Sequence, residues 1–372
     1  MIVSYRYRLL PSRRQHLALE RILDAQRQLY NAALEERIGA YRNAGVTRTY
    51  MDQAKALTEW RRSDSEASGL PANLQRATLK RLDEAYRGFF RRMVNGEKPG
   101  FPRFRGAGRF VSFGFAEFSG ITLKARRLRF KGMPGGLRVH WHRDIPQGAP
   151  LKGCVFKRDT KGWTVAFVVS VAGAELRAPQ RTVGVDLGIQ TFATFSDGGF
   201  IPSLRAARRA ERRLRVAQRA VARKQCGSSR RRRAREEVTR CYSQVARQRN
   251  EHLHQASARL VRDYDAIVIE QLNVIGLARG RFAKDVHDAS WAKFISMLRY
   301  KAEWAGAHII EVNPRNTSQE CSGCGAKVPK QLADRLHICP DCGLSTDRDL
   351  NAARNILNRA GVGPGLHNVA GC

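Results

Sequence analysis

The sequence predicts an α+β protein with more than one domain, and three observations lead to this fold class. The chain has 372 residues, of which 42% are hydrophobic, so it is long enough for several cores and apolar enough to fold. Helical and strand-like patterns alternate along it, separated by Gly- and Pro-rich segments. Two Cys-x-x-Cys pairs near the C-terminal end are typical of an inserted metal-binding module.

A helical unit is expected near the start of the chain. Residues 2–9 alternate as a strand does, and Ser12 then offers an N-cap to a helix with apolar residues at helical spacing. Two more helical patterns surround residues 51–57 and 79–93. The helical unit is therefore expected over residues 12–95.

A β-rich unit should follow the helical one. Gly and Pro break the helical pattern after residue 95, and short alternating runs extend from residue 110 to residue 171. These runs predict an antiparallel sheet or a small barrel. The N-terminal strand could join it, which would make the helical unit an insertion.

From residue 182 the predicted order is strand, strand, strand, helix, strand, helix, strand, helix. An arginine-rich helical hairpin at residues 204–250 precedes the fourth strand, and residues 361–372 have the composition of a turn-rich tail. This order matches the ribonuclease H-like arrangement. In that arrangement the first and fourth strands are neighbours and the last helix packs beside them.

Three acidic residues occupy informative places in this order. Asp186 lies in the first strand, Glu270 ends the fourth and Asp349 begins the last helix. A single Asp at a strand end is more often a turn or cap residue, but three acids in this order predict a common site. Carboxylates of this kind can hold two Mg²⁺ ions, which stabilise the attacking and leaving oxygens when a phosphodiester is cleaved.

Asp347 competes with Asp349 for the third place in this site. Asp is a common helix N-cap, so we expect Asp347 to cap the last helix or support the site, and Asp349 to bind metal. Asn351 and Arg354 on the same helix are weaker candidates.

The cysteines predict a structural zinc site. Cys321, Cys324, Cys339 and Cys342 form two knuckles at zinc-ribbon spacing, and four thiolates leave no open position on the metal. Four thiolates already fill a tetrahedral site, so His337 is not needed as a ligand. It is expected at the surface or in contact with nucleic acid. The remaining cysteines, which lack partner spacing, are interpreted as ordinary thiols: Cys154, Cys226, Cys241 and Cys372.

The net charge of +34 and the pI near 11.0 point to a long polyanion as partner. No apolar run reaches the length of a membrane span or a signal core, so a cytoplasmic, nucleoid-associated protein without a membrane partner is expected. The candidate nucleic-acid contacts are Arg103, Arg230, Arg231, Arg232 and Arg233. Phe101 and Phe104, which alternate with arginines, could stack on bases or belong to a core.

Several segments resemble the TnpB family of transposon-encoded RNA-guided DNA nucleases, which are related to type V CRISPR effectors. The matching segments are GVDLG at 184–188, IEQLN at 269–273, NTSQECSGCG at 316–325, CG at 342–343 with DRDLNAARN at 347–355, and KPGFPRF at 98–104. The resemblance implies a guide RNA from the transposon end and a short target-adjacent motif in the DNA. It also implies that Asp186, Glu270 and Asp349 are the magnesium-binding triad of a RuvC nuclease domain.

The resemblance implies the domain boundaries as well. A wedge domain would cover residues 1–11 and 96–178, with the helical recognition unit at 12–95 inserted in it. The RuvC domain would cover residues 179–316 and 346–372, and the zinc ribbon residues 317–345. The basic hairpin would lie along the guide–target duplex or gate the site.

The function expected from the sequence is RNA-guided, magnesium-dependent cleavage of double-stranded DNA by a monomer on one RNA. Two alternatives remain. One is a RuvC-like nuclease that needs no RNA. The other is a non-catalytic nucleic-acid-binding regulator of transposition.

Overall fold

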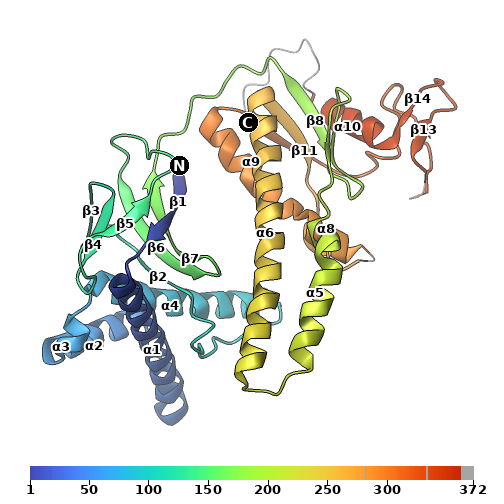
Figure 1. Cartoon of the computed structure of the whole chain (residues 1–372). Helices are drawn as coiled ribbons and strands as arrows, with labels where there is room; N and C mark the ends of the chain where they lie inside the picture. The colour runs from blue at the N-terminus through green and yellow to red at the C-terminus, as the bar shows by residue number, and fades with distance from the viewer. Residues whose placement is uncertain (281, 332–333, 362–372) are drawn as a thin grey trace. The chain divides into compact units, whose positions relative to one another are not determined.

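The chain divides into two compact units in its computed structural model, which describes residues 1–280, 282–331 and 334–361 (Figure 1). The first unit is Met1–Val171, and the second begins at Ala172. The expected tail after residue 361, including Cys372, lies outside the described residues.

The first unit is built on a seven-stranded antiparallel sheet with the order β2-β6-β7-β1-β5-β4-β3. Its strands are β1 (Ile2–Leu10), β2 (Ser112–Phe115), β3 (Ile121–Lys124), β4 (Arg127–Phe130), β5 (Leu137–His140), β6 (Leu151–Asp159) and β7 (Gly162–Ser170). The N-terminal strand lies at the centre, between β7 and β5. The helices between β1 and β2 therefore interrupt this sheet in sequence. The sheet is open, with β2 and β3 at its edges, which decides between the sheet and the barrel.

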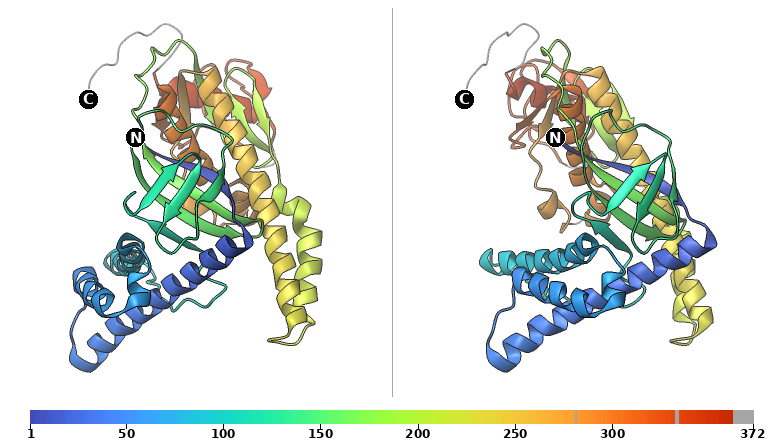
Figure 2. Two further views of the ribbon diagram at one scale, coloured as in Figure 1. Left: turned by 60° about the vertical axis from the view of Figure 1, so that its left-hand side comes forward. Right: turned by 90° about the vertical axis from the view of Figure 1, so that its left-hand side faces the viewer.

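Four helices follow β1, and Figure 2 shows them gathered on one side of the sheet. They are α1 (Arg13–Ala44), α2 (Tyr50–Ser63), α3 (Ser65–Ser68) and α4 (Ala72–Val94). The expected cap is present, because the Ser12 hydroxyl accepts from the Gln15 N–H and the Gln15 side chain accepts from the Ser12 N–H. α1 ends at Ala44, and the C-cap Gly45 that follows has a φ of 64°, which suits glycine.

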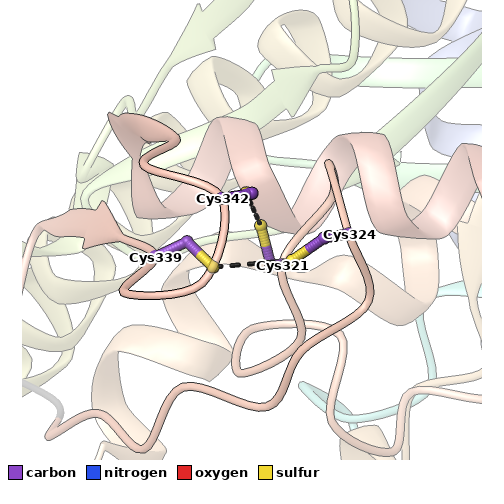
Figure 3. Close-up of side chains that lie close together, drawn as sticks. All are labelled: Cys321, Cys324, Cys339 and Cys342. Atoms are coloured by element: carbon purple, nitrogen blue, oxygen red, sulfur yellow. Dashed lines mark hydrogen bonds between the residues drawn. The ribbon is translucent and has the colours of Figure 1, made fainter.

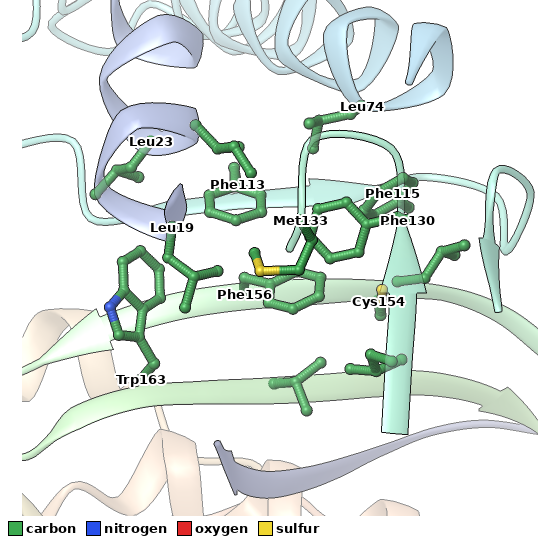
Figure 4. Packing of buried hydrophobic residues seen from close by; sticks show 14 of the residues in the cluster. Leu19, Leu23, Leu74, Phe113, Phe115, Phe130, Met133, Cys154, Phe156 and Trp163 are labelled. Atoms are coloured by element: carbon green, nitrogen blue, oxygen red, sulfur yellow. The ribbon is translucent and has the colours of Figure 1, made fainter. Parts of the chain in front are cut away.

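The core of the first unit lies between the sheet and the helices α1 and α4 (Figure 4). Leu19 and Leu23 of α1 and Leu74 of α4 point toward aromatic residues of the sheet, including Phe113, Phe156 and Trp163. The rings of Phe113 and Phe156 stack with centroids 5.0 Å apart. Burial of these side chains fixes the helices to one face of the sheet.

The second unit contains a five-stranded sheet with the order β10-β9-β8-β11-β12. Its strands are β8 (Thr182–Asp186), β9 (Thr191–Phe195), β10 (Phe200–Pro202), β11 (Ala266–Glu270) and β12 (His308–Val312). β8, β11 and β12 run parallel, and β9 and β10 are antiparallel to their neighbours. The predicted adjacency of the first and fourth strands is confirmed.

The helices of the second unit surround this sheet and extend from it. They are α5 (Ala206–Ala222), α6 (Ser229–Asp263), α7 (Val274–Leu277), α8 (Ala283–Ala289), α9 (Trp291–Ala305) and α10 (Arg348–Arg359). The hairpin of β13 (Leu336–Ile338) and β14 (Ser345–Asp347) precedes α10. The sequence pattern did not indicate α7 and α8, because helices of 4 and 7 residues are too short to show an amphipathic repeat.

The arginine-rich segment forms the expected antiparallel helical hairpin. α5 and α6 pack along a thin seam in which Ala217, Cys241 and Val245 are buried (Figure 1). α6 continues without interruption to Asp263, just before β11. In the part of the chain that the structure describes, no helix combines the length and the apolar character needed to cross a membrane.

Candidate functional site

Asp186, Glu270 and Asp349 meet at one end of the parallel sheet. Val185 of β8 lies opposite Ile269 of β11, so Asp186 and Glu270 end neighbouring strands. Asp349 stands in the first turn of α10, which packs against both strands. The fold therefore brings together three acids that are far apart in sequence.

Gly184 allows α10 to approach β8 closely. A Cβ atom at this position would lie 2.2 Å from the Ala353 carbonyl oxygen and 2.8 Å from the Leu357 nitrogen. Only glycine fits such a contact between two backbones. The close approach places the first turn of α10, and with it Asp349, beside the end of β8.

The charges of the three acids interact. Burial raises the pKa of Asp186 well above its usual value, and the nearby carboxylates of Glu270 and Asp349 raise it further. Burial also raises the pKa of Glu270, although a hydrogen bond from Thr317 and the charge of Arg359 oppose this shift. The burial of Asp186 beside two other carboxylates favours a bound cation.

Asp347 and Asp349 take different roles at the start of α10. Asp347 is the N-cap, and its Oδ1 accepts hydrogen bonds from the N–H groups of Asp349 at 2.8 Å and Leu350 at 3.1 Å. The Asp349 carboxylate instead lies 3.4 Å from the Arg348 guanidinium and 3.7 Å from that of Arg335. The expected cap is therefore confirmed for Asp347, and Asp349 remains the candidate ligand.

The four expected cysteines gather in space (Figure 3). The Sγ atoms of Cys321 and Cys342 are 3.6 Å apart, those of Cys324 and Cys339 are 3.5 Å apart, and all four lie within 4.8 Å of one another. A tetrahedral zinc ion with Zn–S bonds of about 2.3 Å separates its sulfurs by about 3.8 Å. The donor set and spacing therefore suit a structural zinc ion.

The two knuckles share one turn geometry. The Gly325 N–H donates to the Cys321 carbonyl at 2.9 Å, and the Gly343 N–H donates to the Cys339 carbonyl at 3.0 Å. Burial raises the pKa of Cys321, but hydrogen bonds, from the Cys324 N–H first and from His337 among others, lower it to about 6. Cys321 is thus the thiol that ionises most readily, whereas hydrogen bonds among the sulfurs raise the pKa of Cys324 and Cys342.

His337 is not at the surface, and that sequence-based expectation is wrong. Its side chain is fully buried, Lys330 Nζ lies against its Nδ1, and it contributes to the lowered pKa of Cys321. The reason is the alternation of β13, in which Leu336 and Ile338 face solvent and the histidine faces inward. His337 therefore lines the inside of the cysteine module, as we call residues 321–342, which carry the four clustered thiols.

The predicted nucleic-acid contacts are mostly exposed arginines. Arg103, Arg230, Arg232 and Arg233 are exposed, whereas Arg231 is partly buried and donates to the Lys224 carbonyl at 2.8 Å, which closes the hairpin turn. Arg231 is therefore the weakest of these candidates.

Phe101 and Phe104 do not belong to a core. Their exposed fractions are 47% and 53%, which decides against that alternative. Phe101 packs edge-on against Phe89, with ring centroids 5.4 Å apart, and so has a fixed position.

Sequence reasoning missed Thr317 and Asp288. The Thr317 hydroxyl donates to Glu270 at 2.5 Å, and Asp288 of α8 accepts from the Ala207 N–H and from Arg249. Thr317 lies within the segment that carried the resemblance, but no spacing shows a contact with a residue 47 positions earlier. Nothing in the sequence singled out Asp288.

Comparison with known proteins identifies the family. Family models match residues 166–281 ("Probable transposase"), 291–356 ("Cas12f1-like, TNB domain") and 1–45 ("Helix-turn-helix domain"). A "Putative RNA-guided DNA endonuclease" of Streptomyces pristinaespiralis is 34% identical over 367 residues, covering 95% of this chain and 88% of that protein. A TnpB-like protein of Acanthamoeba polyphaga mimivirus is 30% identical over 118 residues, covering 30% of this chain and 22% of its own.

This chain belongs to the TnpB family. A further relative, named "Putative RNA-guided DNA endonuclease" in Escherichia coli K12, is 25% identical over 376 residues and covers 95% of this chain and 91% of its own. In this TnpB-family chain, residues 1–45 form β1 and the single helix α1, whatever the description of the model that matches them.

Solved structures share the fold of this TnpB-family protein. A Cas12f1 complex with guide RNA and target DNA has a TM-score of 0.61 at 14% identity and covers 94% of this chain and 84% of that one. The RNA-guided endonuclease CRISPR-Cas_phi3 has a TM-score of 0.51 at 11% identity, with coverages of 97% and 92%. The fold class is thus the expected one. It combines a RuvC (ribonuclease H-like) domain carrying a zinc ribbon with an N-terminal β-rich wedge interrupted by a helical unit.

Proposed function

We propose that this protein is an RNA-guided, magnesium-dependent endonuclease that cleaves double-stranded DNA beside a short target-adjacent motif. The observation that carries the proposal is the meeting of Asp186, Glu270 and Asp349 at one end of the RuvC-type sheet. The names of the relatives from Streptomyces pristinaespiralis and Escherichia coli K12 support the RNA-guided DNA cleavage.

The three acids would hold two Mg²⁺ ions. Among the described residues, only the four cysteines bring three or more potential ligand atoms within 4.8 Å of one another, so the carboxylates are more widely spaced. Phosphodiester cleavage is typically served by two ions about 3.5–4 Å apart, and Mg²⁺, which keeps several waters, needs few carboxylates. Bound there, the ions would supply charge stabilisation to the attacking and leaving oxygens.

The protein's own groups place and balance these carboxylates. Asp347 caps α10 and so fixes the turn that carries Asp349. Arg335 and Arg348 offset the Asp349 charge while no cation is present. Thr317 holds one oxygen of Glu270. These contacts would keep the three carboxylates in position before metal and DNA bind.

The partners would be a guide RNA from the transposon end and the target duplex, bound by a monomer on one RNA in the nucleoid. The net charge of +34 favours a long channel that contacts phosphates, while base pairing supplies the specificity. Arg103, Arg230, Arg232 and Arg233 are the exposed candidates for phosphate contact, and Arg231 is a secondary one. The proposed wedge, recognition, RuvC and zinc-ribbon boundaries are those implied by the resemblance.

The test begins with the RNA that copurifies with the protein. Absorbance at 260 and 280 nm before and after ribonuclease treatment reveals bound RNA, and sequencing it gives the guide. The complex is then incubated with Mg²⁺ and duplexes that match the guide beside a randomised flank. Cut molecules should share a short flanking motif.

Variants at the three acids decide between the alternatives. Asp186→Asn, Glu270→Gln and Asp349→Asn should each slow guided cutting by about 100-fold or more, because each removes several kcal/mol of charge stabilisation. Cutting that survives ribonuclease treatment would indicate an RNA-independent RuvC-like nuclease. If the wild type cuts nothing and all three variants bind nucleic acid as it does, the protein is a non-catalytic regulator.

A further inference from the structure

Thr317 is a buried residue in direct contact with Glu270. Its side chain is only 2% exposed, and its Oγ1 lies 2.5 Å from Glu270 Oε1 and 3.1 Å from the Pro314 carbonyl oxygen. Both neighbours are acceptors, and a hydroxyl has a single proton to donate. The nearer acceptor belongs to a carboxylate, so the proton lies on the bond to Glu270.

The position of Thr317 is set by two buried asparagines of α10. Asn355 Nδ2 donates to the carbonyls of Thr317 at 2.8 Å and Glu320 at 2.6 Å. Asn351 Nδ2 also donates to the Glu320 carbonyl, at 2.7 Å, and its Oδ1 accepts from the Ser322 N–H at 2.9 Å. The segment from Thr317 to Ser322 is thus attached to the helix that carries Asp349.

This attachment links the two candidate metal sites. The attached segment contains Cys321, and α10 follows the β13–β14 hairpin that holds the second knuckle. One helix therefore positions Asp349 directly and Glu270 through Asn355 and Thr317. The cysteine module fixes the other end of the same segment.

We propose that Thr317 is a positioning residue that orients the Glu270 carboxylate toward the divalent cation. The proposal rests on the proposed function, in which Glu270 is a ligand. A glutamate at the end of a strand has several side-chain rotamers. A hydrogen bond to Oε1 selects one of them and leaves Oε2 available to a cation. Outer partners of metal-binding carboxylates typically contribute about 10- to 100-fold in metal affinity.

A purely local role makes a different prediction. The contact with the Pro314 carbonyl, three residues earlier, is a common way for threonine to stabilise a turn. If Thr317 served only that turn, its loss would lower thermal stability and leave metal affinity unchanged.

The experiment measures Mn²⁺ binding directly, by the loss of the free-ion signal in electron paramagnetic resonance. The full-length protein retains its zinc, is stripped of other divalent ions, and is compared with Thr317→Val, Thr317→Ser and Ser318→Ala. Ser318 is an exposed hydroxyl residue beside Thr317 and provides the matched control.

Thr317→Val should weaken Mn²⁺ binding by about 10- to 100-fold. Thr317→Ser keeps the hydroxyl, so it and Ser318→Ala should stay within about threefold of the wild type. The Mg²⁺ concentration that half-saturates guided cleavage should rise in the same order. If Thr317→Val does not fold, Thr317→Ala takes its place, because it removes the hydroxyl without adding volume.

Glu270→Gln separates failure of this inference from failure of the proposed function. If Glu270→Gln loses Mn²⁺ binding while the threonine variants without a hydroxyl bind as the wild type does, the role of Thr317 is refuted and the metal site stands. If Glu270→Gln binds Mn²⁺ unchanged, both proposals are refuted.

Discussion

Asp186 is the residue whose surroundings indicate metal binding most strongly. Its pKa is raised by burial and by the charges of Glu270 and Asp349. A raised carboxyl pKa means that the ionised form is disfavoured in the folded, metal-free protein. The same arrangement favours a divalent cation, which removes the repulsion between the three carboxylates.

This arrangement predicts a pH-dependent cost in stability. The unfolded chain ionises Asp186 near its usual value of 3.8, and the folded chain does so at higher pH. The contribution of Asp186 to the free energy of unfolding is therefore fully present below pH 3.8, and it is lost as the pH rises through the raised pKa of the folded state. Without metal, Asp186→Asn should exceed the wild type in Tm by roughly 3 °C or more at pH 7.

Thermal melting in a chelator between pH 4 and pH 8 checks this prediction. The advantage of Asp186→Asn should increase with pH, and saturating Mg²⁺ should reduce or reverse it. A difference in Tm that does not vary with pH would contradict the electrostatic account.

Gly184 gives a second prediction at the residue scale. Gly184→Ala would place a Cβ atom 2.2 Å from the Ala353 carbonyl oxygen, so α10 must shift. We expect a loss of about 1–3 kcal/mol in the stability of the second unit and a marked loss of guided cleavage. Gly39→Ala, inside α1 with nothing within 4 Å of its Cβ, should instead stabilise the first unit by up to about 1 kcal/mol. Urea unfolding and cleavage assays of both variants test this contrast.

Sequence reasoning reached some residues of the site and not others. Asp186, Glu270 and Asp349 could be found because strand ends and helix starts are visible as changes in apolar pattern. Thr317 could not, since its contact with Glu270 depends on the path of a segment without regular structure. His337 was misjudged because three residues of β13 are too few to show which face is buried.

At the scale of elements, α8 fixes the base of the basic hairpin. The Asp288 carboxylate accepts from the Ala207 N–H at the start of α5, at 2.9 and 3.0 Å, and from Arg249 of α6 at 2.8 Å. Its side chain is 8% exposed and that of Arg249 is 25% exposed, so this ion pair is partly buried, unlike the pair between Asp285 and the exposed Arg208. A short helix thus joins both arms of the hairpin at their base.

Asp288→Asn should loosen this base. Removing one partner of a partly buried, hydrogen-bonded ion pair costs about 1–3 kcal/mol, whereas the same change at an exposed pair costs about 0–1 kcal/mol. Amide hydrogen exchange at the start of α5 should therefore accelerate strongly in Asp288→Asn and little in Asp285→Asn. Equal acceleration in the two variants would show that Asp288 does not hold the hairpin.

The cysteine module is the second element that supports the site. Its four thiols suit zinc, and its segment is attached to α10 by Asn351 and Asn355. We expect one zinc ion per chain in the wild type. Cys339→Ser should lose it, while Cys226→Ser, at an exposed cysteine away from the cluster, should keep it.

Elemental analysis by mass spectrometry measures the zinc content of these variants. Hydrogen exchange in β13, β14 and the first turn of α10 should rise with zinc loss, because the metal joins the two knuckles. A Cys339→Ser protein with unchanged zinc would refute the four-thiolate site.

At the scale of the whole molecule, the order of elements was predictable and the details of the sheets were not. Periodicity placed β8, β11 and α10 within a few residues of their bounds, and their order predicted the fold class. The central position of β1 in its sheet depends on pairing with β7, more than 150 residues later, and local pattern carries no such information. The pattern therefore left the choice between sheet and barrel open.

The charge of the whole chain gives the site its context. The positively charged side chains behind the net charge of +34 repel one another, and the described acids already form ion pairs with some of the arginines. A bound polyanion would relieve this repulsion, and a guide RNA with its DNA target would supply the negative charge. The proposed carboxylate site would then cut the DNA that the RNA selects.

Guided cleavage with a changed guide tests the central claim most directly. The complex is assembled with an RNA whose target-matching segment has been replaced, and with wild-type protein, Asp349→Asn or Asp347→Asn. The account predicts that the wild type cuts the new target and leaves the old one intact. Asp349→Asn should be inactive, and Asp347→Asn, which loses only cap strength, should retain cutting. Cutting that does not follow the guide, or that survives in Asp349→Asn, would contradict the account.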